Sequence, residues 1–202
     1  AFLYSGTGIA DQTQANEYNI YFSVPATVRQ GSGAVFSVSA SGGAYTIDSI
    51  TDGGINYRNG HKIKILGTDL GGASPANDLI ILVTTVGDLG TGTISVVSVD
   101  SGTADISASG PYSVSGTNYQ VGSGATFEVN LGTDAAPQLN PYVSVTNVGS
   151  NYVQYDELII DGSVFAGGTS GTTDLNIRVG DVQGGGTVWY LDQTIFRNTT
   201  PN

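Results

Sequence analysis

Residues 31–38, Gly31-Ser32-Gly33-Ala34-Val35-Phe36-Ser37-Val38, recur at residues 122–129 as Gly122-Ser123-Gly124-Ala125-Thr126-Phe127-Glu128-Val129. Three further landmarks follow in the same order in both places. They are Asn56-Tyr57 with Asn151-Tyr152, Leu70-Gly71-Gly72 with Ala166-Gly167-Gly168, and Asn77-Asp78-Leu79 with Thr173-Asp174-Leu175. Upstream, Tyr21 and Tyr112 each precede their Gly-Ser-Gly by ten residues. The offset grows from 91 (31 to 122) to 96 (77 to 173), which a longer loop at Gly132–Pro141 in the second copy explains. The sequence therefore predicts an internal repeat.

Each copy has the apolar pattern of β-strands. Apolar and polar side chains alternate over residues 34–40, which places Phe36 and Val38 on one buried face. Residues 62–65 alternate in the same way, and residues 79–86 form the nearly continuous apolar run of a strand covered on both faces. Further strands are predicted at 45–51, 93–99, 126–131, 142–148, 157–160, 174–179 and 187–191. Glycine-rich turns separate these strands, and we find no helical period.

This pattern predicts an all-β protein of two tandem antiparallel β-sandwich or partly open barrel domains related by the internal repeat. The small-residue stretch at 101–109 sets the boundary between the copies. We expect an N-terminal extension at 1–17, a first repeat domain at 18–103, a second repeat domain at 104–195 and a C-terminal tail at 196–202.

Charge is scarce and mostly negative. Charged residues make up 11% of the chain, and the net charge is −11. Six cationic side chains are too few for a nucleic-acid footprint, so we expect no nucleic-acid partner. The acidity also disfavours anionic membrane surfaces, and no apolar run nears the ~18 residues of a membrane helix, so we expect no membrane insertion. Cysteine is absent, which excludes disulfides and thiolate chemistry.

The residues offer little for catalysis, and we expect no enzyme, no cofactor and no metal site. His61 is the only histidine, it starts a predicted strand, and no serine lies in a nucleophile elbow. Asp156 and Glu157 are neighbours and point to opposite faces of a strand, so they cannot act as a facing pair. They and the other acids near turns, Asp48, Asp52 and Asp161, are predicted to be solvated surface groups.

Two apolar segments fall outside the repeat pattern and are candidate subunit contacts. Phe2, Leu3 and Tyr4 can form a strand that covers an edge of their own sheet or adds to a neighbour's sheet. Trp189 and Tyr190 have no aromatic counterpart in the first copy and either pack internally or meet a partner. On the predicted strand 62–65, Lys62 and Lys64 share the outer face, where they discourage edge pairing or meet an acidic patch.

Four segments of the first copy together resemble a β repeat of virion structural proteins of tailed phages, cyanobacterial and marine phages above all. They are the Gly-Ser-Gly-Ala-Val-Phe-Ser-Val strand, residues 53–60 (Gly-Gly-Ile-Asn-Tyr-Arg-Asn-Gly), Leu70-Gly71-Gly72 and residues 75–79 (Pro-Ala-Asn-Asp-Leu). The resemblance covers residues 31–100 well and 122–191 loosely. The second copy departs from the pattern before Asn151-Tyr152 and lacks the Pro-Ala-Asn. The resemblance implies a fibre, baseplate, neck or capsid-decorating component.

We therefore expect a non-enzymatic structural component of a virion, located in the extracellular particle, whose partners are copies of itself and other virion proteins. Two alternatives stay open. One is a glycan- or receptor-binding adhesin module that uses the loops Gly132–Pro141 and Gly67–Pro75 to contact a host-surface glycan. The other is a subunit of a cell-surface filament in which the N-terminal segment is donated as a strand to the next subunit.

Overall fold

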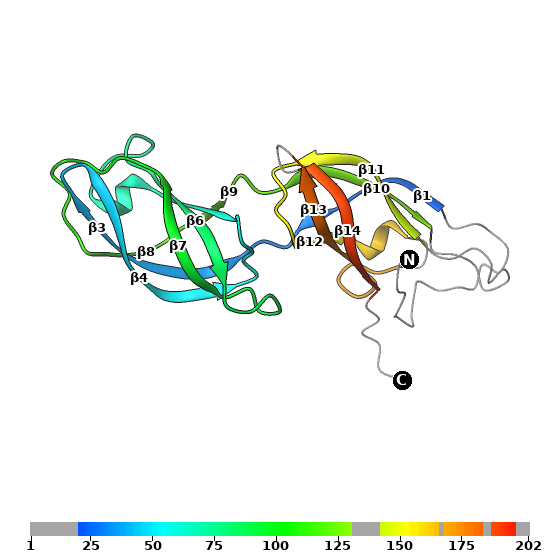
Figure 1. Cartoon of the computed structure of the whole chain (residues 1–202). Coiled ribbons are helices and arrows are strands. Elements are labelled where there is room, and N and C mark those ends of the chain that lie inside the picture. The colour runs from blue at the N-terminus through cyan, green and yellow to red at the C-terminus, as the bar shows by residue number, and fades with distance from the viewer. Residues whose placement is uncertain (1–19, 131–141, 166–167, 184–186, 197–202) are drawn as a thin grey trace. The chain divides into compact units, whose positions relative to one another are not determined.

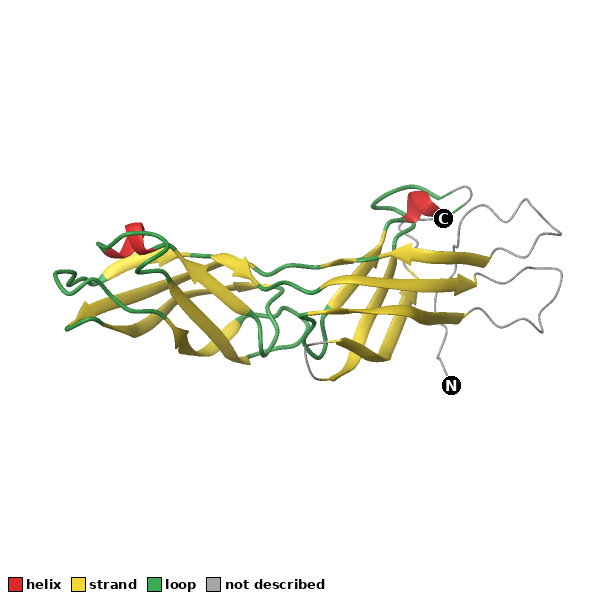
Figure 2. Ribbon diagram, turned by 90° about the horizontal axis from the view of Figure 1, so that it is seen from above, coloured by secondary structure: helices red, strands yellow, loops and turns green. Residues whose placement is uncertain are grey.

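A computed structural model of the chain describes residues 20–130, 142–165, 168–183 and 187–196 (Figure 1). Within these residues all strand pairs are antiparallel. The helical segments described are two single turns of 3-10 helix, η1 (Gly67–Leu70) and η2 (Gly162–Val164), drawn red in Figure 2. The predicted all-β, antiparallel sandwich class is confirmed.

The chain divides into two compact units, and the sequence of one is inserted within the sequence of the other. The inserted unit is one continuous segment, Gln30–Val121. The flanking unit combines Ala1–Arg29 with Gly122–Asn202. The chain therefore passes from one unit to the other twice, at 29/30 and at 121/122.

The inserted unit contains two sheets. One has the strand order β4-β3-β8 and the other the order β7-β6-β5-β9. Their bounds are β3 (Ser32–Ser41), β4 (Ala44–Ile55), β5 (Lys62–Ile65), β6 (Leu79–Val86), β7 (Ile94–Ser101), β8 (Tyr112–Ser115) and β9 (Thr117–Tyr119). Strands β8 and β9 follow each other directly, so one short stretch of chain forms an edge of both sheets.

The flanking unit has the same arrangement. Its sheets have the orders β1-β10-β11 and β14-β13-β12-β2. The bounds are β1 (Ile20–Pro25), β2 (Thr27–Val28), β10 (Ser123–Asn130), β11 (Tyr142–Ser150), β12 (Glu157–Ile160), β13 (Leu175–Gln183) and β14 (Thr187–Phe196). Here the stretch shared by both sheets is β1–β2. In Figure 1, β1 (blue) lies beside β10 and β11 although it is far from them in sequence.

We call β1–β2 arm A and β8–β9 arm B, and we call β3–β7 body 1 and β10–β14 body 2. Arm A precedes body 1 in sequence and pairs with body 2, whereas arm B precedes body 2 and pairs with body 1. The two copies thus exchange their first strands reciprocally within one chain.

Each unit has its own hydrophobic core, built from matched positions. Phe36 and Val38 are fully buried in the inserted unit, as predicted, and Phe127 and Val129 are fully buried in the flanking unit. The other shared core positions include Ala34 and Ala125, Tyr57 and Tyr152, Ile63 and Leu158, Ile65 and Ile160, Leu79 and Leu175, Ile81 and Ile177, and Val83 and Val179.

The units differ from the expected domains at 18–103 and 104–195. Residues 18–29 belong to the flanking unit and residues 104–121 to the inserted unit. The reason is the exchange of arms, because each arm is bonded to the other copy's body. Phe196, which we expected in the tail at 196–202, is the last residue of β14.

Candidate functional site: the arm-acceptor slots

Arm B lies in a slot of body 1 between the edges of β3 and β5. On β3 its register pairs Val114 with Phe36 and Tyr112 with Val38. On β5 it pairs Asn118 with Ile63 and Thr117 with Lys64. Val114 is 7% exposed and belongs to the hydrophobic core of the inserted unit. The slot therefore binds a strand through backbone hydrogen bonds and one buried apolar anchor.

Gly116 is the point at which arm B changes from one sheet to the other. A Cβ atom here would lie 2.5 Å from the Lys64 carbonyl oxygen and 2.6 Å from Ile63 Cγ2. No side chain fits at this position, because the backbone of the arm here lies very close to β5. The slot is thus shaped for a strand with a small residue at its centre.

Arm A occupies the corresponding slot of body 2. Val24 lies opposite Phe127 on β10, and Val28 lies opposite Leu158 on β12. Val24 is 6% exposed and joins the core of the flanking unit, with Ala26 and Val28 packed against that core. Val24 therefore anchors arm A as Val114 anchors arm B.

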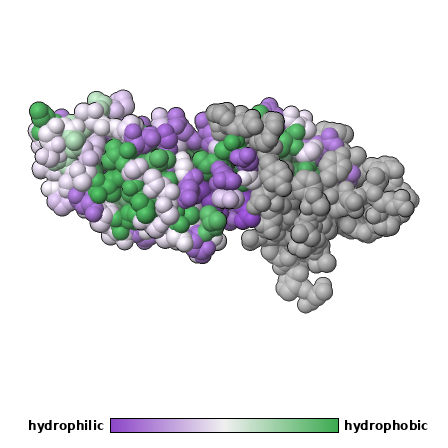
Figure 3. Space-filling view, viewed as in Figure 1, coloured by the Kyte–Doolittle hydropathy of each residue, from purple (hydrophilic) through white to green (hydrophobic). Residues whose placement is uncertain are grey.

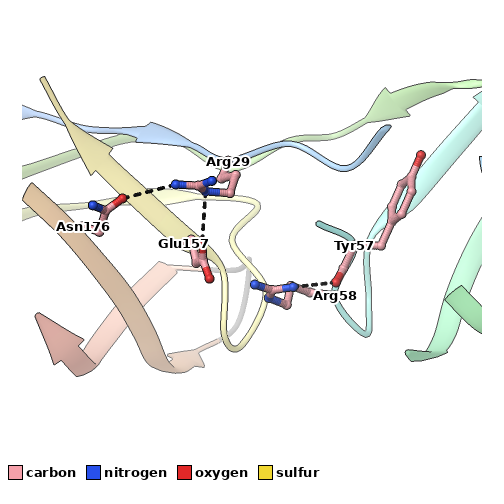
Figure 4. A network of polar contacts seen from close by, with 5 residues as sticks. All are labelled: Arg29, Tyr57, Arg58, Glu157 and Asn176. Atoms are coloured by element: carbon pink, nitrogen blue, oxygen red, sulfur yellow. Dashed lines mark hydrogen bonds and ion pairs between the residues drawn. The ribbon is translucent and has the colours of Figure 1, made fainter. Parts of the chain in front are cut away.

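A polar cluster fixes the end of arm A (Figure 4). The backbone N–H of Arg29 donates to the Glu157 carbonyl oxygen at 2.7 Å, and Arg29 Nε lies 2.9 Å from Glu157 Oε2. Arg29 Nη2 also donates to Asn176 Oδ1 at 3.4 Å. Both partners of the ion pair are about one-third exposed, so it contributes at most about 1 kcal/mol and serves mainly to position the arm.

The Gly-Ser-Gly motif builds the first strand of each body. A Cβ on Gly31 would lie 2.3 Å from the Tyr57 ring, and one on Gly122 would lie 2.3 Å from the Tyr152 ring. These glycines therefore let a buried tyrosine pack against the start of the strand that carries the slot. Only a glycine leaves that room.

The two tyrosines are also held by their hydroxyl groups. The N–H of Ala125 donates to the Tyr152 hydroxyl oxygen at 3.1 Å. Burial raises the pKa of Tyr152, and this hydrogen bond opposes the rise. Burial likewise raises the pKa of Tyr57, opposed by a hydrogen bond with the backbone of Ala34. Both hydroxyls thus stay neutral and tie a loop to the first strand of the body.

The sequence-predicted contact residues are not tested by the described structure. Phe2, Leu3 and Tyr4 lie outside the described residues. Trp189 and Tyr190 lie in β14, where Tyr190 is in register with Asp181, and their side chains are outside the described part. The arms, in contrast, were not predicted as a site. The signal for them was the matched placement of Tyr21 and Tyr112 before the two Gly-Ser-Gly motifs.

His61 and Asp156 occupy matched places and have the same structural task. His61 Nδ1 accepts from the Arg58 N–H at 3.2 Å, and Asp156 Oδ2 accepts from the Val153 N–H at 2.9 Å. Each closes the turn that follows a buried tyrosine. In the first of these turns Arg58, which is 3% exposed, also donates from Nη1 to the Tyr57 carbonyl oxygen at 2.8 Å (Figure 4). The prediction of a solvated Asp156 is wrong, because this residue is 1% exposed and bonded to the backbone.

The other acids at turns accept local hydrogen bonds. Asp52 accepts from the Gly54 N–H at 2.8 Å, and Asp48 from the Ser39 hydroxyl at 2.6 Å. Asp161 accepts from the hydroxyls of Ser163 and Ser170, which lower the pKa of its carboxyl. Glu157 pairs with Arg29. Within the described residues no three His, Cys, Asp or Glu side chains gather as a metal site would need.

Lys62 and Lys64 face outward on β5, opposite the buried Ile63 and Ile65, as predicted. Lys62 Nζ lies 2.9 Å from Asp100 Oδ2, and Lys64 Nζ lies 2.6 Å from Asp78 Oδ2. Both lysines therefore bind acids of their own unit. The Asp78 side chain is only 8% exposed, and its hydrogen bond with Lys64 holds the pKa of its carboxyl below the ordinary value.

Apolar side chains also gather on the surface of the inserted unit over β4 and β7 (Figure 3). Val96 and Val99 of β7 are 50% and 41% exposed there. In the described part of the chain no helix is long and apolar enough to span a membrane.

No protein-family model, no curated protein and no solved structure matches this chain.

Proposed function

We propose that this protein is a non-enzymatic structural component of an assembled particle, a virion in the first place. The observation that carries the proposal is the reciprocal exchange of arms. A spacer or decoration protein has to keep its domains together for the lifetime of a particle, and the exchange supplies two separate means of doing so.

The first means is covalent. The chain crosses between the units at 29/30 and again at 121/122. A single break at either crossing leaves the other crossing intact. An ordinary tandem pair of domains has one linker, and one cut in that linker separates them.

The second means is the pairing of strands. Each arm is bonded to both sheets of the body from the other copy, so neither copy can leave as a folded piece without breaking backbone hydrogen bonds and exposing Val24 or Val114. Opening of this kind loses the backbone hydrogen bonds of both strands of an arm together with the burial of its valine. This resistance to separation suits a part of a particle.

The resemblance of residues 31–100 to phage virion repeats supports a virion as the particle. The net charge of −11 favours solubility before assembly. Antibodies raised against the full chain test the proposal by immunogold electron microscopy of purified particles and of host cells. Gold at fixed positions on the particle is the expected result. Gold on cell-surface filaments selects the filament alternative, and protein found only in the soluble lysate refutes a structural role.

A further inference from the structure

The two arm-acceptor slots are chemically alike. In each, a valine of the arm lies opposite a fully buried phenylalanine of the body, Val114 on Phe36 and Val24 on Phe127. The second part of each arm then pairs with the strand that carries Ile63 or Leu158. Nothing in this register depends on which chain supplies the arm.

The connections from each arm to the next strand decide where the arm goes. β2 ends at Val28 and β3 begins at Ser32, and β9 ends at Tyr119 and β10 begins at Ser123. Three residues therefore join each arm to the strand that follows it. Within the inserted unit the end of arm B lies beside the start of β3, since Asn118 Nδ2 donates to the Gly31 carbonyl oxygen at 2.8 Å. Val28 holds the place in arm A that Asn118 holds in arm B. An arm folding back on its own body would therefore need a tight hairpin, of Arg29-Gln30 for arm A and of Tyr119-Gln120-Val121 for arm B.

These segments are poor hairpin loops. Two-residue hairpins need positive φ at one or both central positions, which favours Asn-Gly, Asp-Gly or Gly-Gly. Arg29-Gln30 contains neither glycine nor asparagine. In the other loop Gln120 does take a positive φ of 53°, but a three-residue hairpin needs a left-handed residue at its last position, where Val121 is β-branched. Closure of each copy on itself is disfavoured, so an arm finds its partner on another body.

We propose that the arm-acceptor slots also take the arm of a second copy of this chain, which gives strand-exchanged dimers and longer chains. Every strand pair of the monomer is retained in such a dimer. The monomer is favoured at low concentration because both arms and both bodies belong to one chain, which holds each arm near its slot at an effective concentration of about 1 mM. This inference goes beyond the particle proposed above, and its test does not involve the particle.

Paired cysteines report which chain donates the arm, because the chain has no cysteine of its own. Val35 and Ser115 are in register across β3 and β8. A V35C/S115C chain is unfolded and then refolded at about 1 µM and at about 1 mM, below and at the effective concentration. S37C/S49C, in register within body 1 on β3 and β4, is the matched control. Both are oxidised and analysed on non-reducing gels.

We expect V35C/S115C to give monomers at the low concentration and a ladder of covalent dimers and higher species at the high one. S37C/S49C stays monomeric on the gel under both conditions, although its oligomers are visible in native gel filtration. Oligomers in which V35C/S115C cross-links only within a chain overturn the proposal, as does a monomer at every refolding concentration.

A hinge variant gives a second readout. Changing Arg29-Gln30 and Gln120-Val121 both to Asn-Gly permits closure of each copy on its own body, so the oligomer fraction at about 1 mM falls several-fold while circular dichroism is unchanged. I106G, at a turn residue that is 84% exposed, is the control for loss of a surface side chain and leaves the oligomer fraction as it was. An equal oligomer fraction in the hinge variant contradicts the role given to the hinges.

Discussion

A single cut between the two copies should leave both halves together. A protease site is inserted between Ile106 and Ser107, in the exposed connection that follows body 1. Cleavage gives one fragment with arm A and body 1 and another with arm B and body 2. Because each arm is bonded to the body of the other fragment, each unit then contains both fragments.

The strength of this association follows from the arms. Arm B has four register pairs with β3 and three with β5, and arm A has four with β10 and two with β12. At about 1 kcal/mol net for each hydrogen bond and about one bond per pair, each arm contributes roughly 6 kcal/mol. Burial of Val24 and Val114 adds about 2 kcal/mol each. The two arms together thus contribute about 16 kcal/mol. Association costs about 8 kcal/mol, which leaves a binding free energy of about 8 kcal/mol and a Kd of about 1 µM.

Gel filtration with light scattering at about 50 µM measures the outcome, well above the expected Kd. We expect the main species to have the mass of the uncut chain, 20.7 kDa plus the inserted site, and to separate into two in denaturant or on dilution well below 1 µM. V114A weakens the association about thirtyfold through the loss of about 2 kcal/mol, whereas S113A on the exposed face of the same arm leaves it unchanged. Two separate halves in native buffer would refute the exchange of arms.

Three further predictions concern single side chains. Gly116→Ala lowers the free energy of unfolding of the inserted unit by several kcal/mol because its Cβ meets β5, whereas Gly87→Ala, with 3.9 Å to its nearest neighbours, changes it by less than about 1 kcal/mol in chemical denaturation. Tyr152→Phe leaves the Ala125 N–H without its acceptor and costs the flanking unit about 1–3 kcal/mol in the same assay. The pKa of Asp78 is lowered in the folded state, so its contribution is complete above the unfolded value near 3.8 and is lost as the pH falls through the folded value. Asp78→Asn should therefore lower the melting temperature at neutral pH and flatten its decline below about pH 4, and a decline as steep as that of the parent chain would contradict this role.

The strands and their buried faces were predictable because alternation of side chains is a local property. Phe36 and Val38 face the core for the reason the sequence indicates, and Ile63 and Ile65 do the same between two outward lysines. The partner of an arm is not a local property. The pattern around Val24 or Val114 is the same whether the arm pairs with its own body or with the other one, so a division at 103/104 was the natural expectation.

The side chains that close the turns, His61 and Asp156, also show what the local sequence can and cannot predict. His61, predicted at the start of the strand 62–65, directly precedes β5 and closes the turn before it. The burial of Asp156 was missed because an aspartate at a turn is usually solvated. The matched position of His61 in the first copy was the available signal, because both side chains accept a backbone N–H at the same point of the turn.

The place at which the chain crosses between its units has a consequence for how the number of repeats can change. The crossings at 29/30 and 121/122 lie within one residue of the two Gly-Ser-Gly motifs, which are also the best-matched segments of the two copies. A recombination between the gene segments that encode these motifs removes residues 31–121 and joins Gln30 to Gly122. The shortened chain keeps arm A together with body 2, already bonded to each other in the parent, and a duplication at the same point adds one more body with one more arm. Gain and loss of a repeat thus preserve one arm for every slot.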